Sequence, residues 1–239
     1  MKAATFDLMS STPVLGALFD WDGVVIDSSA QHAQSWERLS AEIGLPLPAG
    51  YFKASFGMKN EIIIPEILRW TSDAALIRQY SLRKEEHYRD IIREGGIEPL
   101  PGVSEFLQRL KEARIPCVVG TSSHRLNIQV ALDLFGFNDF FIDIVSSEDV
   151  GRGKPDPEVF VKAAGKAGVP PERCVVFEDA PVGIEAGLRG GMKVVGVAGT
   201  HPEGPLAGAH RIVKRLDVLS VEDLMALWGE PASLSKESV

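Results

Sequence analysis

Two pairs of acidic residues each stand at the end of an apolar run, and carboxylates placed in this way could do chemistry. Asp20 and Asp22 follow the first of these runs, and Glu178 and Asp179 follow a later one. In such a site one carboxylate can attack or bind a metal while another passes a proton to or from the same atom. Glu178 and Asp179 have no Lys or Arg beside them in the sequence, and hard oxygen ligands of this kind suit Mg²⁺. Taken alone, the first pair fits acidic turn residues at a strand end equally well.

Two other segments offer groups that bind phosphate. Thr121 and Ser122 follow the apolar run 115–120, and a hydroxyl with free backbone N–H groups at the start of a helix makes an anion site. Ser and Thr at such positions are also common helix N-caps. Lys154 stands in a Gly-Lys-Pro-Asp-Pro segment, where a fixed ammonium would offset repulsion between an attacking carboxylate and a phosphate dianion. A solvated loop lysine is the alternative at this position.

Taken in order, these segments resemble the four sequence motifs of the haloacid dehalogenase (HAD) superfamily. The matching stretches are Asp20-Trp21-Asp22-Gly23-Val24, Gly120-Thr121-Ser122, Gly153-Lys154-Pro155-Asp156-Pro157, and Glu178-Asp179 with Gly183 and Ala186. The resemblance implies that Asp20 is the nucleophile and Asp22 the general acid/base. It implies that Thr121 holds the transferring phosphoryl group and that Lys154 pairs with the nucleophile and the phosphoryl oxygens.

The same resemblance implies a metal site. By this resemblance, Mg²⁺ in this protein would bind the carboxylates of Asp20 and Asp179 and the backbone carbonyl of Asp22, and Glu178 would hold its waters. Ser122 would help to bind the remaining phosphate oxygens.

The segment after the first motif resembles one branch of the superfamily, that of β-phosphoglucomutase and phosphoglycolate phosphatase. Asp-Gly-Val-x-x-Asp-Ser is followed there by a helical cap that closes over the site. The resemblance implies substrate-binding roles for His32 and Lys84. Where the mutase has an Arg for the distal phosphate, the loop Gly57-Met58-Lys59-Asn60 offers Lys59.

The expected order of strands and helices, which would position these functional residues, predicts an α/β fold with two parts. Strands alternating with helices imply a Rossmann-like parallel sheet core with helices on both faces. We assign residues 1–27 and 98–239 to this core, and residues 28–97, which lack strand signals, to an inserted all-helical cap. In the cap we expect helices over 31–43, over 61–70 with Pro65 in its first turn or at a kink, and from a Ser72-Asp73 cap to about Glu94, with a loop over 51–60. The strands are predicted at 14–19, 115–120, 140–145, 173–177, 193–197 and 211–213, and the core helices at 103–113, 124–134, 157–168, 181–189 and 220–228.

Composition narrows the class of protein. The net charge of 25 − 33 = −8 argues against a nucleic-acid or anionic-membrane surface. No apolar run approaches the length of a membrane span, and residues 1–12 lack the pattern of a signal peptide. Cys117 and Cys174 fall in predicted inner strands, so we expect no disulfide and a cytoplasmic protein. We expect a monomer or weak homodimer and a mobile tail after Gly229.

The sequence therefore predicts a Mg²⁺-dependent phosphatase that hydrolyses a small phosphorylated metabolite through an aspartyl-phosphate. Three alternatives stay open: a β-phosphoglucomutase-like isomerase, a riboflavin-pathway phosphatase, and a non-catalytic metabolite-binding regulator. The riboflavin alternative comes from a Phe-Gly-Met-Lys-Asn-Glu stretch in the cap that is similar to plant proteins with that role. A dehalogenase is disfavoured, because that reaction needs neither the second Asp nor a metal.

Overall fold

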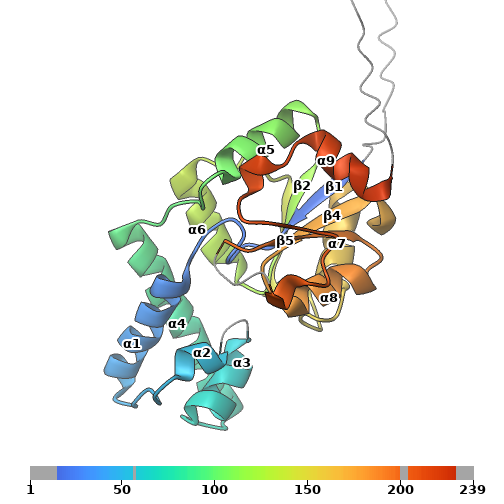
Figure 1. Cartoon of the computed structure of the whole chain (residues 1–239). Helices are drawn as coiled ribbons and strands as arrows, with labels where there is room; N and C mark the ends of the chain where they lie inside the picture. The colour runs from blue at the N-terminus through green and yellow to red at the C-terminus, as the bar shows by residue number, and fades with distance from the viewer. Residues whose placement is uncertain (1–14, 56–57, 200–203, 230–239) are drawn as a thin grey trace, which may run out of the picture.

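A six-stranded parallel sheet forms the centre of the protein, with strand order β3-β2-β1-β4-β5-β6. The structure is a computed structural model and describes residues 15–55, 58–199 and 204–229 (Figure 1). The strands are β1 (Gly16–Phe19), β2 (Cys117–Gly120), β3 (Asp143–Val145), β4 (Cys174–Glu178), β5 (Lys193–Val197) and β6 (Arg211–Val213). The predicted α/β class with a parallel sheet is confirmed.

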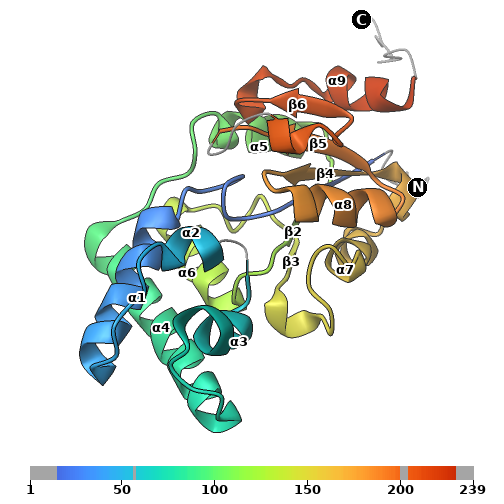
Figure 2. The same cartoon turned by 60° about the horizontal axis from the view of Figure 1, so that its bottom comes forward.

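Helices cover both faces of the sheet, as the nearly unbroken apolar strands require. One face packs against α5 (Val103–Glu112), α6 (Arg125–Phe135) and the short α9 (Val221–Met225). The other face packs against α7 (Glu158–Ala167) and α8 (Pro181–Arg189) (Figure 2). Successive residues of β1 point to opposite faces of the sheet. Phe19 belongs to the apolar core against α5 and α6, and Leu18 to the core against α7 and α8.

The strand register determines where the functional residues meet. Phe19 pairs with Val119 of β2 and with Phe177 of β4, so the three central strands end at the same level. Asp20 continues β1 by donating its backbone N–H to the Phe177 carbonyl at 3.0 Å. The carboxyl ends of parallel strands form the usual binding edge of such sheets.

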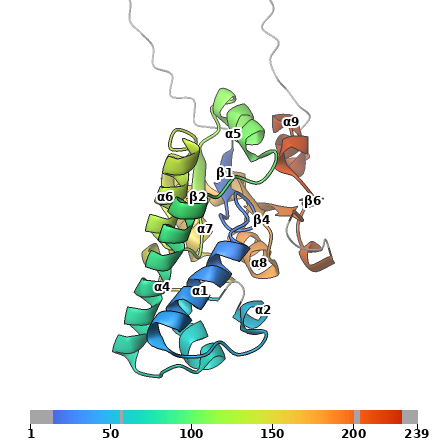
Figure 3. The same ribbon diagram turned by 90° about the vertical axis from the view of Figure 1, so that its left-hand side faces the viewer.

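A block of helices separates β1 from α5 in the chain and packs around its own core. It contains α1 (Ser29–Ile43), α2 (Tyr51–Ser55), α3 (Asn60–Ile62), the π-helix η1 (Ile63–Leu68) and α4 (Ala74–Gly95). The buried residues of this core are Trp36, Leu39, Ile63, Ile64 and Leu68. Asp73 caps α4, as predicted, by accepting from the N–H groups of Ala75 and Leu76. The block lies beyond the end of the sheet that carries the motifs, with α4 beside α6 (Figure 3). The division of the chain at residues 28 and 97 stays a prediction.

The structure differs from two local expectations in the cap. The helix expected over 61–70 is a single α turn followed by the π-helix η1, with Pro65 inside it. Proline cannot donate the hydrogen bond that a regular helix needs there, and a wider π turn accommodates the break. The loop expected over 51–60 contains the one-turn helix α2, which is too short to show a periodic pattern.

Strands β2 and β3 are shorter than predicted. Pro116 lies outside β2 but still accepts a hydrogen bond from the Ala17 N–H at 3.0 Å. Ahead of β3, Phe137 and Phe140 pack edge to face across a turn, with 5.2 Å between ring centroids, so the apolar run 140–142 is not part of the strand. The predictions for the segment 1–12, for Gly57 and for the tail after Gly229 fall outside the described residues.

Candidate active site

Three of the predicted carboxylates meet at the carboxyl edge of the sheet. One oxygen each from Asp20, Glu178 and Asp179 lies within 4.8 Å of the others. This follows from the fold, because β1 and β4 are neighbours that end at the same level. Asp179 is 3% exposed and Glu178 fully buried, so three negative charges are held together with little water to screen them.

Lys154 reaches two of these acids. Its Nζ lies 2.9 Å from Asp20 Oδ1 and 2.6 Å from Glu178 Oε1, and it stands 4.8 Å from the centroid of the Phe160 ring. Glu178 has no cationic neighbour in the sequence, but the fold supplies one from a loop 24 residues away. Burial opposes the protonated state of Lys154, yet Asp20 and Glu178 more than offset this and raise its pKa above the ordinary value.

The acidic cluster fits a divalent cation. Its donors are all hard carboxylate oxygens, and the Lys154 ammonium pairs with two of them, those of Asp20 and Glu178. Burial, opposed by Lys154 and assisted by Glu178 and Asp179, raises the pKa of Asp20 well above its ordinary value. A bound cation would relieve this crowding of like charges.

Two glycines make room for the cluster. Gly23 has φ +82°, and a Cβ there would overlap the Asp179 carboxylate. A Cβ on Gly183 in α8 would overlap the carboxylate of Glu178. These glycines therefore belong to the site, although neither carries a functional group.

Asp22 stands apart from the three clustered carboxylates. Its two oxygens accept hydrogen bonds from the hydroxyls of Ser28 and Ser123, and His32 Nε2 lies 3.7 Å from Oδ1. Burial works against its charge, but the nearby His32 imidazole and the hydrogen bonds from Ser123 and Ser28 hold the pKa of Asp22 below its ordinary value. A metal contact from Asp22 would have to come from its backbone carbonyl, as the resemblance implies, since its side chain is engaged elsewhere.

Neither Ser28 nor Ser123 was predicted as a site residue. Both lie close in sequence to predicted site residues: Ser28 lies six residues after Asp22, and Ser123 directly follows Ser122. Residue types and spacing do not tell which hydroxyl of such a run will face the acid. Ser123 contacts Asp22 only because β2 lies beside β1 in the sheet.

Thr121 and Ser122 occupy the end of β2. Thr121 is 1% exposed, and its Oγ1 accepts a hydrogen bond from the Ser123 N–H at 3.0 Å. Its hydroxyl keeps a proton that can be donated to a ligand. Ser122 is half-buried beside it, and its contact with phosphate stays a prediction.

The cap brings His32 and Lys84 to Asp22. His32 Nδ1 lies 2.6 Å from Lys84 Nζ, and the imidazole stacks on the Tyr88 ring at 4.2 Å. Lys84 is 3% exposed and has the rings of Trp36 and Tyr88 at 5.5 and 5.6 Å. The two predicted cap residues thus form one connected group with the acid/base candidate.

Lys59 approaches the core from another direction. Its Cε lies 3.3 Å from the position that a Cβ on Gly153 would take, so the side chain rests against the loop that carries Lys154. Within the described part of the chain, no hydrogen bond or ion pair engages its ammonium. Lys59 therefore offers a free positive charge near the motifs.

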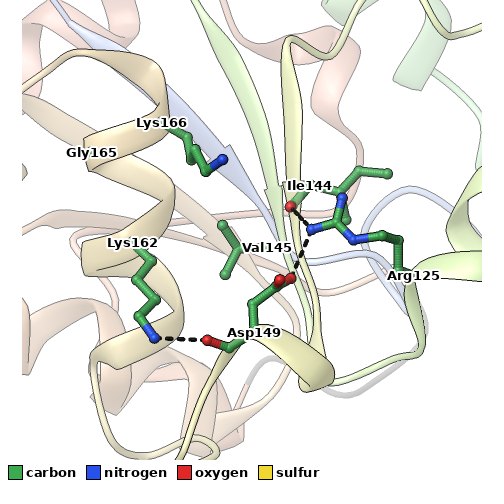
Figure 4. A pocket seen from close by; sticks show the side chains of 7 residues that line it. All are labelled: Arg125, Ile144, Val145, Asp149, Lys162, Gly165 and Lys166. Atoms are coloured by element: carbon green, nitrogen blue, oxygen red, sulfur yellow. Dashed lines mark hydrogen bonds and ion pairs between the residues drawn. The ribbon is translucent and has the colours of Figure 1, made fainter.

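A hollow of about 370 Å³ lies away from these residues, between β3, α6 and α7 (Figure 4). Arg125 there binds Asp149 Oδ2 at 2.8 Å, and Lys166 binds Asp143 Oδ2 at 2.8 Å. Lys162 donates to the Asp149 carbonyl at 2.7 Å. These cations are already paired, so the hollow offers an anion no preformed site.

The chain belongs to the haloacid dehalogenase-like hydrolases, whose family model matches residues 14–191. It is 42% identical over 216 residues to the chloroplastic 5-amino-6-(5-phospho-D-ribitylamino)uracil phosphatase of Arabidopsis thaliana, covering 89% of this chain and 57% of that protein. It is 30% identical to the β-phosphoglucomutase of Bacillus subtilis, covering 88% of this chain and 94% of the mutase. Its fold is similar to the crystal structure of a HAD hydrolase of family IA, variant 3, from Entamoeba histolytica, with TM-score 0.81 and 28% identity, covering 90% of this chain and 100% of that one.

The chain thus spans little more than half the length of the Arabidopsis relative, but nearly all of the mutase. Among the described residues, no helix is both long enough and apolar enough to cross a membrane.

Proposed function

We propose that this protein is a Mg²⁺-dependent phosphatase of small phosphorylated metabolites that works through an aspartyl-phosphate on Asp20. One observation carries the proposal: Asp20 belongs to a cluster of three acids suited to a cation and lies 2.9 Å from the Lys154 ammonium, with Asp22 two residues further along the chain. Family membership and the phosphatase among the relatives support the same reaction class.

In the first step, a carboxylate oxygen of Asp20 attacks phosphorus in line, and the bond from phosphorus to the leaving oxygen breaks. Lys154, at 2.9 Å from Asp20, offsets the repulsion between this carboxylate and the phosphate dianion. Thr121 donates its hydroxyl to a phosphoryl oxygen, and Ser122 binds beside it.

Asp22 transfers protons in both steps. It gives a proton to the leaving oxygen in the first step. In the second step it takes a proton from the water that attacks phosphorus, while the bond from phosphorus to Asp20 breaks and inorganic phosphate leaves. Its lowered pKa keeps Asp22 deprotonated, which is the form that the second step needs as a base. For the first role Asp22 must gain a proton, and the negative charge of an arriving phosphate favours this.

Asp20 and Asp179 would hold Mg²⁺, with Glu178 orienting its waters and the Asp22 carbonyl as a further ligand. When bound, the ion supplies positive charge that neutralises phosphoryl oxygens and fixes their orientation. Lys154 would stay paired with Glu178 at the edge of this group.

For the substrate we propose a phosphate monoester of a polyol or sugar, bound between the cap and the sheet edge with the help of Lys59, Lys84 and His32. A specific candidate is 5-amino-6-(5-phospho-D-ribitylamino)uracil, because the Arabidopsis phosphatase named for that compound is 42% identical to this chain. We propose a cytoplasmic location and a monomer or weak homodimer.

A mutase is the second candidate, favoured by the 30% identity to the B. subtilis enzyme. A mutase must hold a second phosphate, and Lys59 binds phosphate as a point charge where an Arg would use a bidentate fork. We therefore expect water to capture the intermediate.

The experiment is to incubate the purified protein with β-glucose 1-phosphate, Mg²⁺ and a trace of the 1,6-bisphosphate, and to follow both products. Free phosphate without glucose 6-phosphate supports the hydrolase. Rapid formation of glucose 6-phosphate with little free phosphate would establish the mutase. A panel of phosphorylated metabolites that includes the ribitylaminouracil phosphate would name the substrate, and no turnover of any ester would favour a binding regulator.

A further inference from the structure

Asn127 of core helix α6 uses both ends of its side-chain amide to hold cap helix α4. Its Nδ2 donates to Glu85 Oε2 at 2.6 Å, and its Oδ1 accepts from Arg89 Nη1 at 3.0 Å. The two partners are four residues apart on α4, so they lie on one face of that helix. A flipped amide would place NH₂ against the guanidinium and oxygen against the carboxylate. The two contacts therefore allow a single orientation of the amide.

Glu85 connects this contact to the cap residues near the site. Its Oε1 accepts from Lys84 Nζ at 3.0 Å and from Asn60 Nδ2 at 2.7 Å. Burial opposes ionisation of this side chain, which is 4% exposed, but Lys84, His32 and His124, with the Asn127 amide, hold the pKa of Glu85 below its ordinary value. Glu85 is therefore a buried carboxylate whose two oxygens are both satisfied.

The contacts continue without a break to the acid/base candidate. Lys84 Nζ lies 2.6 Å from His32 Nδ1, and His32 Nε2 lies 3.7 Å from Asp22 Oδ1. A buried charge that loses its partner is strongly destabilising, so each member constrains the next. Among the described residues, Glu85 is bonded by Lys84 and Asn60 of the cap itself and by Asn127 of the core.

We propose that Asn127 is a positioning residue, which clasps Glu85 and Arg89 and so places the Lys84–His32 pair against Asp22 when the cap lies on the core. The role in turnover rests on the proposed phosphatase function, while the placement of His32 does not. Without the clasp, the cap keeps its own fold around its separate apolar core. The imidazole then loses its fixed place beside Asp22.

An exchange of partners tests the clasp. Asn127→Asp sets two carboxylates against each other, and Glu85→Gln sets two amide NH₂ groups against each other. In the double variant Glu85→Gln with Asn127→Asp, the Gln amide donates to the new carboxylate, which still accepts from Arg89. The double variant also keeps the net charge of the wild type. Asn138→Asp is the matched control, because Asn138 is exposed in the turn that follows α6 and, among the described residues, bonds Gln129 and Asp133.

With p-nitrophenyl phosphate and Mg²⁺, we expect each single variant to lose about tenfold or more in kcat/KM, the worth of one charge-assisted hydrogen bond. The double variant should recover to within about threefold of wild type, and Asn138→Asp should match wild type. Singles that keep wild-type kcat/KM, or a double variant as slow as the slower single, would overturn the proposal.

The imidazole NMR signals of His32 supply a readout that needs no turnover. They should shift in both single variants and return toward wild type in the double variant. A protein without phosphatase activity but with this pattern would refute the proposed function and leave the clasp intact. If a single variant fails to fold, Arg89→Met can be used instead, because it removes the hydrogen bond from Arg89 to Asn127 and leaves Glu85 in place. Unchanged His32 signals in Arg89→Met would overturn the proposal.

Discussion

The carboxylate of Asp179 occupies the space that a side chain on residue 23 would need. Gly23 turns the chain away from β1 with φ +82°, and its missing Cβ lets the β4 side of the site approach the first motif. Gly183 leaves room for Glu178 in the same way. The cluster of Asp20, Glu178 and Asp179 therefore depends on the missing Cβ atoms of Gly23 and Gly183 as well as on its three carboxylates.

Gly183→Ala should push the Glu178 carboxylate away from Lys154, because the new methyl group overlaps its present position. We expect a weaker apparent affinity for Mg²⁺ and a loss of turnover, both measured by titrating activity with the ion. Gly165→Ala is the matched control: it lies in α7 with nothing within 4 Å of the new Cβ. It should leave activity unchanged and stabilise the fold by about 0.5–1 kcal/mol. Equal Mg²⁺ titrations for both variants would show that the packing of Glu178 does not matter to the metal site.

Asp179→Ala should raise the Mg²⁺ concentration needed for half-maximal activity, because it removes a carboxylate ligand. A chelator should abolish activity in the wild type, and added Mg²⁺ should restore it. The same variant should melt at a higher temperature than the wild type without metal, since it removes one of three crowded negative charges. Unchanged Mg²⁺ dependence together with an unchanged melting temperature would rule out the proposed cation site.

Asp22→Asn should lower kcat by ~10²–10⁴, the usual worth of a general acid/base. Esters with poor leaving groups should suffer most, because their leaving oxygen needs the proton that Asp22 supplies. The comparison of an alkyl phosphate with p-nitrophenyl phosphate in the same variant measures this difference. An equal loss for both esters would mean that Asp22 acts in some other way.

Acid unfolding should report on Glu85. Its pKa in the folded protein lies below the ordinary value of 4.5, so its charge stabilises the fold above that pH, and the contribution is lost as the pH falls. The stability advantage of wild type over Glu85→Gln should therefore shrink below pH ~4.5, by about 1.4 kcal/mol per pH unit. Denaturant unfolding at a series of pH values measures both proteins. A constant difference from neutral pH to about pH 3 would contradict the buried, ionised carboxylate.

The sequence predicted which strand ends meet at the candidate site. Asp20, Thr121 and Glu178 stand at the ends of apolar runs. Parallel pairing of these strands brings their carboxyl ends together, independently of the conformation of the loops. The bounds of α8, β5 and β6 were also predicted correctly, because Pro, Gly and apolar runs mark them clearly.

What the sequence did not predict depends on contacts between distant elements. Ser123 faces Asp22 because of strand order, and Glu85 meets Asn127 because of how the cap lies on α6. A Glu on a long charged helix has the pattern of a solvated residue, and nothing nearby in the chain marks it as buried. The π-helix was not predicted because a short apolar stretch around Pro65 does not distinguish an α-helical from a π-helical period.

The most direct test of the central claim is the mass of the protein after acid quenching during turnover of a phosphate ester with Mg²⁺. The account predicts a fraction of wild-type enzyme heavier by one phosphoryl group, with the added mass on the peptide that contains Asp20. Asp20→Asn should fold normally, show no such species and lose turnover, because the amide keeps the shape but not the nucleophile. Asp20→Asn that still turns over within about tenfold of wild type, or a phosphoryl group on another residue, would contradict the covalent mechanism.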